Sequence, residues 1–143
     1  MAKGLKSLVR LSEWNVDEKR RELAEVLDEM AAAELARDNL EEEVLREQAS
    51  AQESPHEAGL YYGNYADNVI NRRENIRQEI ILIETRVAEA REALNEAYRE
   101  QKKYETVAKN RLEREAKELA LKEQQILDDL GLQNHSKQQA NRD

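Results

Sequence analysis

Apolar residues recur along the first third of this chain at spacings of three, four and seven, the pattern of a helix that buries one stripe of its surface. The series comprises Leu5, Val9, Val16, Leu23, Val26, Met30, Ala33, Leu40 and Val44. Neither glycine nor proline interrupts residues 5–52. The pattern therefore predicts one long helix over about 4–52, with a heptad seam along one side.

A second and more regular apolar series follows. Its seam positions are Val69, Ile76, Ile80, Ile83, Val87, Ala90, Leu94, Ala97, Gln101, Tyr104 and Ala108. The stripe then continues, after an insertion of about four residues into the phase, at Leu112, Ala116, Leu119, Ile126 and Leu130. A second helix is predicted over about 60–130, ending before the helix C-terminal signal Gly131. The polar segment 132–143 is expected to be a disordered tail.

The two predicted helices are joined by a turn over about 50–60. Within it, the run Ser54, Pro55, His56, Glu57 matches a capping box, with Ser at the N-cap and Pro at the first helical position. A short turn makes the helices antiparallel, and facing residue numbers should add to roughly 111. The expected fold of residues 1–131 is one all-α domain, a long antiparallel two-helix coiled coil or helical hairpin, with the second helix longer than the first.

The predicted seam also contains polar and aromatic residues, and their packing follows from separate arguments. Arg37 and Arg73 nearly face each other there, so either the register is off by one residue or carboxylates close a polar layer. Because an unpaired buried charge is costly, the carboxylates are expected, from Glu34, Asp38, Glu41 and Glu74. Trp14, Tyr98 and Tyr104 fall near the end of the shorter helix and are expected to pack in the core.

Composition and charge remove several classes of function. The 143 residues include 31 Asp and Glu against 23 Lys and Arg, for a net charge of −8, which argues against binding to nucleic acid phosphates. Four glycines and one proline are too few for a multi-stranded sheet. Cysteine is absent, which excludes disulfides and thiolate metal sites. No secretory signal or membrane span is expected from the sequence.

Residues suited to catalysis or cofactor binding are scarce. His56 and His135 stand alone, without the helical His and Glu spacing of a zinc site. Carboxylates are numerous, but a two-helix fold offers no cleft that shifts their pKa values for acid–base chemistry. The chain also lacks a glycine-rich phosphate loop. We therefore expect neither an enzyme nor a metal or other cofactor.

Two places are candidates for binding a partner protein. The expected pairing leaves residues from about 107 to 130 without a facing helix, so Leu112, Leu119 and Ile126 form an exposed stripe beside Arg111 and Arg114. The second place is the tyrosine cluster next to the turn, formed by Tyr61, Tyr62 and Tyr65. These rings either plug the end of the hairpin or form an interface patch, since Tyr is a favoured interface anchor.

Taken together, these segments resemble the FliJ family of flagellar type III export proteins. The resemblance is carried by 5–11 (LKSLVRL), 16–24 (VDEKRRELA), 97–105 (AYREQKKYE), 111–115 (RLERE) and 127–129 (LDD). It implies a cytoplasmic coiled coil that is similar to the central stalk of rotary ATP synthases and takes part in flagellum biogenesis and motility. It also implies three partners: the flagellar export ATPase hexamer, the export-gate membrane protein and export chaperones. The association with the inner membrane would then be peripheral, through protein contacts.

Three alternatives share the same helical pattern. The first is the stalk homologue of virulence-type injectisomes, which has a similar shape and task. The second is a helical-hairpin chaperone that holds a client on its exposed stripe. The third is a structural coiled coil that dimerises through residues 107–130. The sequence separates the first alternative poorly from a flagellar stalk. Stoichiometry distinguishes the other two, because a stalk binds one copy per ATPase hexamer, a chaperone binds one or two per client, and the mass of a dimer changes with concentration.

Overall fold

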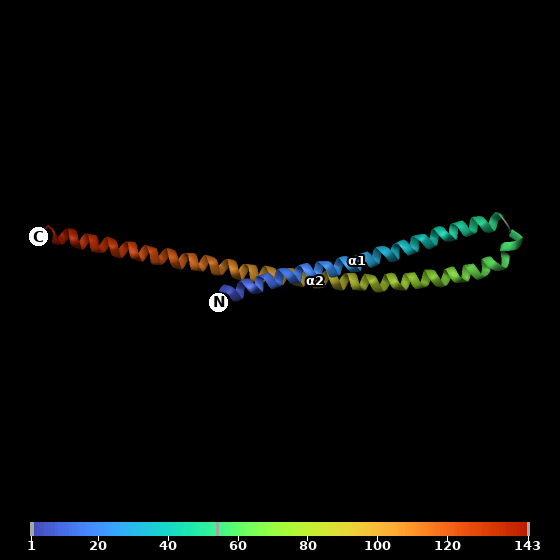
Figure 1. Ribbon diagram of the computed structural model, residues 1–143, viewed down its shortest axis with the longest axis horizontal. Helices are drawn as coiled ribbons and strands as arrows, with labels where there is room; N and C mark the ends of the chain where they lie inside the picture. The colour runs from blue at the N-terminus through green and yellow to red at the C-terminus, as the bar shows by residue number, and fades with distance from the viewer. Residues whose placement is uncertain (1, 54, 143) are drawn as a thin grey trace. The chain divides into compact units, whose positions relative to one another are not determined.

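The computed structural model describes residues 2–53 and 55–142 of the chain. Two helices account for nearly all of them: α1 (Ala2–Glu53) and α2 (Pro55–Ala140). The described residues contain no strand. The predicted fold class, an all-α helical hairpin whose second helix is the longer, is confirmed (Figure 1).

Contacts divide the chain into two units, which are described separately. The first, here called the hairpin unit, comprises residues 13–98. The second, the terminal unit, comprises the described residues before 13 and after 98. Within the hairpin unit, α1 and α2 run side by side in opposite directions, as the cyan and green ribbons in Figure 1 show.

The core of the hairpin unit is a narrow seam. One cluster joins Val26 and Ala33 of α1 to Ile83 and Val87 of α2, and partly buried side chains complete it: Leu23, Met30 and Ile80. A second cluster nearer the turn joins Leu40 and Val44 to Val69, with Tyr65 and Ile76 packed against it. Every residue that the apolar pattern assigned to the seam up to Ala108 is buried or half-buried, which confirms that pattern.

The register differs slightly from the prediction. Val44 packs with Val69, and Val26 packs with Val87. In each pair the two residue numbers add to 113, whereas the predicted sum was 111. The α2 residue of each pair therefore lies two positions further along the helix than predicted. The shift is opposite to the one that the turn alone would give, because α1 ends at Glu53 and α2 begins at Pro55, and these numbers add to only 108.

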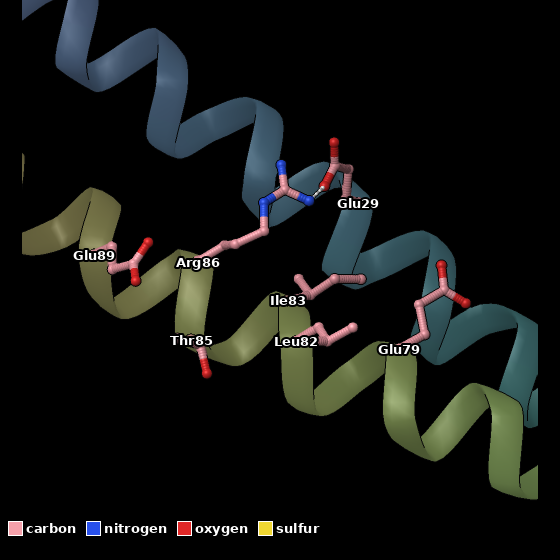
Figure 2. Close-up of a pocket in the computed structure, with 7 residues that line it drawn as sticks. All are labelled: Glu29, Glu79, Leu82, Ile83, Thr85, Arg86 and Glu89. Atoms are coloured by element: carbon pink, nitrogen blue, oxygen red, sulfur yellow. Dashed lines mark hydrogen bonds and ion pairs between the residues drawn. The ribbon is translucent and has the colours of Figure 1, made fainter.

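Salt bridges flank this seam, and some of them join the two helices. Arg73 donates to both carboxylate oxygens of Glu41, at 2.7 and 2.8 Å, and Arg37 lies 3.5 Å from Asp38. Arg73 thus pairs with Glu41 between the helices, whereas Arg37 pairs with Asp38 within α1. Both arginines are about half exposed, so the expected polar layer is not buried in the seam, and Glu74 pairs instead with Arg77. Figure 2 shows Arg86 of α2 reaching across to Glu29 of α1 in the same way. Since all these groups are about half exposed, each pair adds little to stability but disfavours other registers.

Acidic pH is expected to weaken the fold through Glu41. Its pKa is lowered because Arg73 donates hydrogen bonds to it. A carboxyl group with a lowered folded-state pKa stabilises the fold above its ordinary value of 4.5, and that contribution is lost as pH falls further. Urea unfolding at several pH values should therefore show the stability difference between wild type and Glu41→Gln shrinking below that pH. The matched control is Glu42→Gln, whose carboxylate makes no ion pair with the described residues, and its difference should stay flat.

Both ends of α2 lie outside their predicted limits. The predicted N-cap, Ser54, lies outside the described residues, whereas Pro55 takes the first helical position as expected. At the other end, α2 continues through Gly131 to Ala140, so the helix does not end near 130, and most of the segment predicted to be a disordered tail is helical. Gly131 does not have a positive φ and so does not form the left-handed cap that would end the helix.

Trp14 was predicted to pack in the core, and this prediction is wrong. Its side chain is 58% exposed, because the seam position of this turn is taken by Val16, which is 2% exposed. Trp14 comes two residues before Val16, and this separation places it roughly on the opposite side of the α-helix. Tyr98 is 39% exposed, and its hydroxyl accepts hydrogen bonds from Arg20 at 2.8 and 2.6 Å. The Arg20 guanidinium also stacks over the Tyr98 ring, 5.3 Å from its centroid.

Candidate partner-binding surfaces

The terminal unit contains the uncovered part of α2. Residues 2–12 lie beside the first part of this segment, where Tyr104 and Ala108 are half-buried (Figure 1). Arg111 is the last half-buried residue, and every residue from 112 to 142 is exposed. The uncovered stretch therefore begins at 112 rather than at the predicted 107. The difference arises because α1 begins at Ala2 and because of the two-residue register shift found in the hairpin unit.

The uncovered stretch of α2 carries the predicted apolar residues along one face of the helix. We call them the C-terminal stripe: Leu112, Ala116, Leu119, Ile126 and Leu130. Leu112, Leu119 and Ile126 are 67%, 58% and 59% exposed, and their spacing of seven places them on one face of α2. An exposed apolar face of this kind is typical of protein-binding surfaces.

Two arginines lie close to this stripe in the sequence, Arg111 beside it and Arg114 on the opposite side of α2. The Arg111 guanidinium lies 3.7 Å from the Glu115 carboxylate, one turn further along, and is about one-third exposed. Arg114 is exposed and makes no ion pair with the described residues. Thus Arg111 is partly held within its own helix, whereas Arg114 is available to an acidic partner.

A second exposed apolar set was missed by the sequence analysis. Leu121 and Leu132 are 65% and 67% exposed and lie on the face opposite the C-terminal stripe. The heptad series drew attention only to residues in phase with the seam. Placing each leucine around the helix at 100° per residue would have found the second face.

The tyrosine cluster in the hairpin unit is partly structural. The Tyr65 hydroxyl donates to the Glu43 carboxylate at 3.0 Å, and its ring packs against the core cluster nearest the turn. Hydrogen bonds from Tyr65 and then Arg72 lower the pKa of Glu43, while burial and Glu43 raise that of Tyr65. The Tyr61 ring stacks on Tyr65, with centroids 6.3 Å apart and planes 10° apart.

The three tyrosines therefore differ in exposure. Tyr62 is half-buried, with its ring centroid also 6.3 Å from that of Tyr65. Tyr61 is 63% exposed. Tyr65 and Tyr62 thus fit the end plug of the hairpin, and Tyr61 alone presents an open aromatic surface to a partner.

Among the described residues, no other arrangement suggests chemistry. An open groove beside the seam is lined by Glu29, Glu79, Leu82, Ile83, Thr85, Arg86 and Glu89 (Figure 2). It contains neither a histidine nor a hydroxyl paired with a base. In the described part of the chain, no three acidic or histidine side chains converge as a metal site. Nor does any helix in that part have an apolar stretch long enough to span a membrane.

Comparison with known proteins gives a consistent result. The family model described as "Flagellar FliJ protein" matches residues 1–140. Proteins named "Flagellar FliJ protein" from two strains of Caulobacter vibrioides, NA1000 / CB15N and ATCC 19089 / CIP 103742 / CB 15, are each 33% identical over 132 residues. The alignments cover 92% of this chain and 94% of each relative. No solved structure matches significantly.

Proposed function

Because this chain belongs to the flagellar FliJ protein family, we propose that it acts as the central stalk in the ring of the flagellar export ATPase, where it promotes ring assembly and ATP hydrolysis. The family assigns it to flagellar export and to partners within the export apparatus. The names of its relatives favour the flagellar system over the injectisome. The observation that carries the stalk role is the uncovered C-terminal stripe on α2.

The geometry of this part of α2 suits insertion into a ring. A single helix from residue 112 onward is narrow, roughly 10–12 Å across with its side chains. Exposed leucines on two opposite faces, Leu119 and Leu121 for example, give a surrounding partner apolar contacts on more than one side. A groove that held the helix from one side would use only one of these faces.

Coupling to ATP hydrolysis would come from asymmetry. A helix with a broad apolar stripe on one face and two exposed leucines on the other is not symmetric, so it contacts the subunits of a ring unequally. It then favours one arrangement of subunits over the others by its difference in binding energy, since a ligand with equal affinity for all states shifts none of them. In this proposal the chain itself is not catalytic.

The remaining proposed roles concern the export gate and export chaperones. We place them on the hairpin unit, where Tyr61 presents an exposed aromatic ring and Leu45, at 67% exposure, lies on α1. The chain would then reside in the cytoplasm and meet the inner-membrane export apparatus through protein contacts.

A titration of the chain into the export ATPase of the same organism tests the stalk role. ATPase hexamers and hydrolysis rate should rise together and saturate near one chain per hexamer. Mass photometry reports the hexamers, and phosphate release reports the rate. If neither responds while the chain binds an unfolded export substrate, the stalk proposal is wrong and the chaperone alternative replaces it.

A further inference from the structure

Basic side chains gather in the part of the terminal unit where the two helices are paired. Residues 3–12 of α1 contain three basic and no acidic side chains, and residues 99–111 of α2 contain five basic and two acidic ones. This part therefore carries a net charge of +6, although the whole chain carries −8. Such a local excess of positive charge favours contact with an anionic partner.

Five of these basic residues lie on one broad side of the paired helices. The half-buried residues Leu5 and Val9 mark the side of α1 that faces α2, and Tyr104 and Ala108 mark the facing side of α2. Each of the five follows a seam position by one residue, a rotation of about 100° in the same direction on both helices. In an antiparallel pair, equal rotations lead to the same broad side. We call this set the lysine face: Lys3, Lys6, Arg10, Lys102 and Lys109.

The lysine face is open. All five side chains are exposed, and none forms an ion pair with the described residues. In the hairpin unit, by contrast, arginines such as Arg73 are paired across the helices, in that case with Glu41. The one carboxylate on this side, that of Glu105, accepts a hydrogen bond from Gln101 at 3.0 Å. An anionic partner would thus meet five cations without first breaking an ion pair.

We propose that the lysine face binds the surface of an anionic lipid bilayer. Four of its five side chains are lysines, and none is aromatic. Lysine is depleted from protein–protein interfaces, where arginine and aromatic residues are favoured. Clustered lysines are instead attracted to anionic headgroups, and each adds to the attraction. The inference does not depend on the stalk proposal, and it adds a lipid contact to the protein contacts proposed there.

The acidic remainder of the chain does not prevent this contact. At about 0.1 M salt, exposed charges more than about 10 Å apart are largely screened from each other. Because an α-helix rises about 1.5 Å per residue, carboxylates more than about seven residues away along either helix lie beyond that distance. The local charge of the terminal unit therefore decides the contact, and not the net charge of the chain.

The contact would be electrostatic and would not involve apolar insertion. The large apolar residues exposed in the same part are Leu8, Leu11 and Val107, at 41%, 58% and 48%. Each precedes a seam residue by one, so these three lie on the other broad side. They stay outside the bilayer when the lysine face contacts it, and binding should weaken steeply as salt rises.

Flotation of the full chain with lipid vesicles tests the proposal. The chain should float with vesicles of phosphatidylcholine that contain about 30% phosphatidylglycerol, and it should not float with phosphatidylcholine alone. Raising the salt from about 0.1 to about 1 M should release it. The variant Lys3→Gln/Lys6→Gln/Arg10→Gln should lower the partition coefficient at least about 30-fold, because three headgroup contacts are lost.

Matched variants separate the lysine face from net charge and from apolar surface. Arg114→Gln/Lys117→Gln/Lys122→Gln removes the same three charges from exposed positions on the uncovered part of α2. Leu8→Ala/Leu11→Ala removes apolar surface from the other broad side. Each of these controls should change the partition coefficient less than about threefold. Circular dichroism should show equal helix content in all the variants.

Three results would overturn the proposal. One is equal loss from the two triple charge variants, which would show that net charge alone draws the chain to the vesicles. Another is a larger loss from Leu8→Ala/Leu11→Ala, which would show insertion through the other side. The third is no flotation with anionic vesicles. If the chain then bound polyglutamate or duplex DNA through the lysine face, that face would belong to an acidic protein or a nucleic acid instead.

Discussion

Replacement of Leu40 by Ala is expected to lower the free energy of unfolding by about 2–3 kcal/mol, at the lower end of the range for buried Leu to Ala changes. Leu40 is 2% exposed and packs with Val44 and Val69. The value lies at the lower end because a seam between two helices is narrow, and water reaches the space that the lost methyl groups leave. Urea unfolding followed by circular dichroism measures the change.

Leu45→Ala is the matched control for this substitution. It makes the same chemical change five residues further along α1, at a side chain that is 67% exposed. Both variants gain the same small helix propensity, so the difference between them isolates packing. We expect Leu45→Ala to stay within about 0.5 kcal/mol of wild type. Equal losses from the two variants would mean that Leu40 does not lie on the seam.

The fold was largely predictable because one periodic signal dominates the sequence. The spacing of the apolar residues alone predicts that a seam residue such as Val87 is buried. Because turn-forming residues are few, no other topology competes with the hairpin. The ends of the helices were less predictable. Gly131 is a helix-ending signal on average, but its cost in a helix interior is only about 1 kcal/mol, which neighbouring helix-forming residues offset.

The turn shows why register could not be fixed from the pattern alone. The heptad spacing specifies which face of each helix is buried but not how far one slides along the other. Helix α2 begins earlier than expected, at Pro55, yet the paired residues lie further along it than predicted, so the position of the helix start does not set the register. Salt bridges such as Glu41 with Arg73 then agree with the resulting register.

The candidate surfaces were predictable only in part. Leu112, Leu119 and Ile126 follow the seam beyond the end of α1, so spacing found them. Leu121 was missed because it lies out of phase with the seam. Exposure in the tyrosine cluster depends on which ring meets Glu43 across the turn, and neighbouring positions in the sequence do not distinguish Tyr61 from Tyr65.

The variant Leu112→Ala/Leu119→Ala/Ile126→Ala is expected to weaken binding to the export ATPase roughly 100-fold while leaving helix content unchanged. Each of these side chains is more than half exposed in the free chain, so its loss leaves no cavity there. In a ring-bound state each would be buried, and loss of a well-packed interface residue costs about 1 kcal/mol or more. Three such losses correspond to about two powers of ten in affinity.

The hairpin unit supplies a control of equal composition. Leu45, Leu35 and Ile70 are 67%, 60% and 61% exposed, nearly the same as the 67%, 58% and 59% of the three stripe residues. Their triple Ala variant removes the same atoms from the same kind of surface, but within the hairpin unit. Its affinity for the ATPase, measured by fluorescence titration, should stay within about threefold of wild type.

Thermal stability decides between an interface and an internal seam. If the stripe binds a partner, both triple variants should melt close to the wild type, and only the stripe variant should lose ATPase stimulation. If the stripe packed within its own molecule, the stripe variant would melt well below its control, and weakened binding would then follow from unfolding. Because the two triple variants remove equal apolar surface, a difference in affinity without a difference in melting temperature can arise only from where that surface lies on the chain.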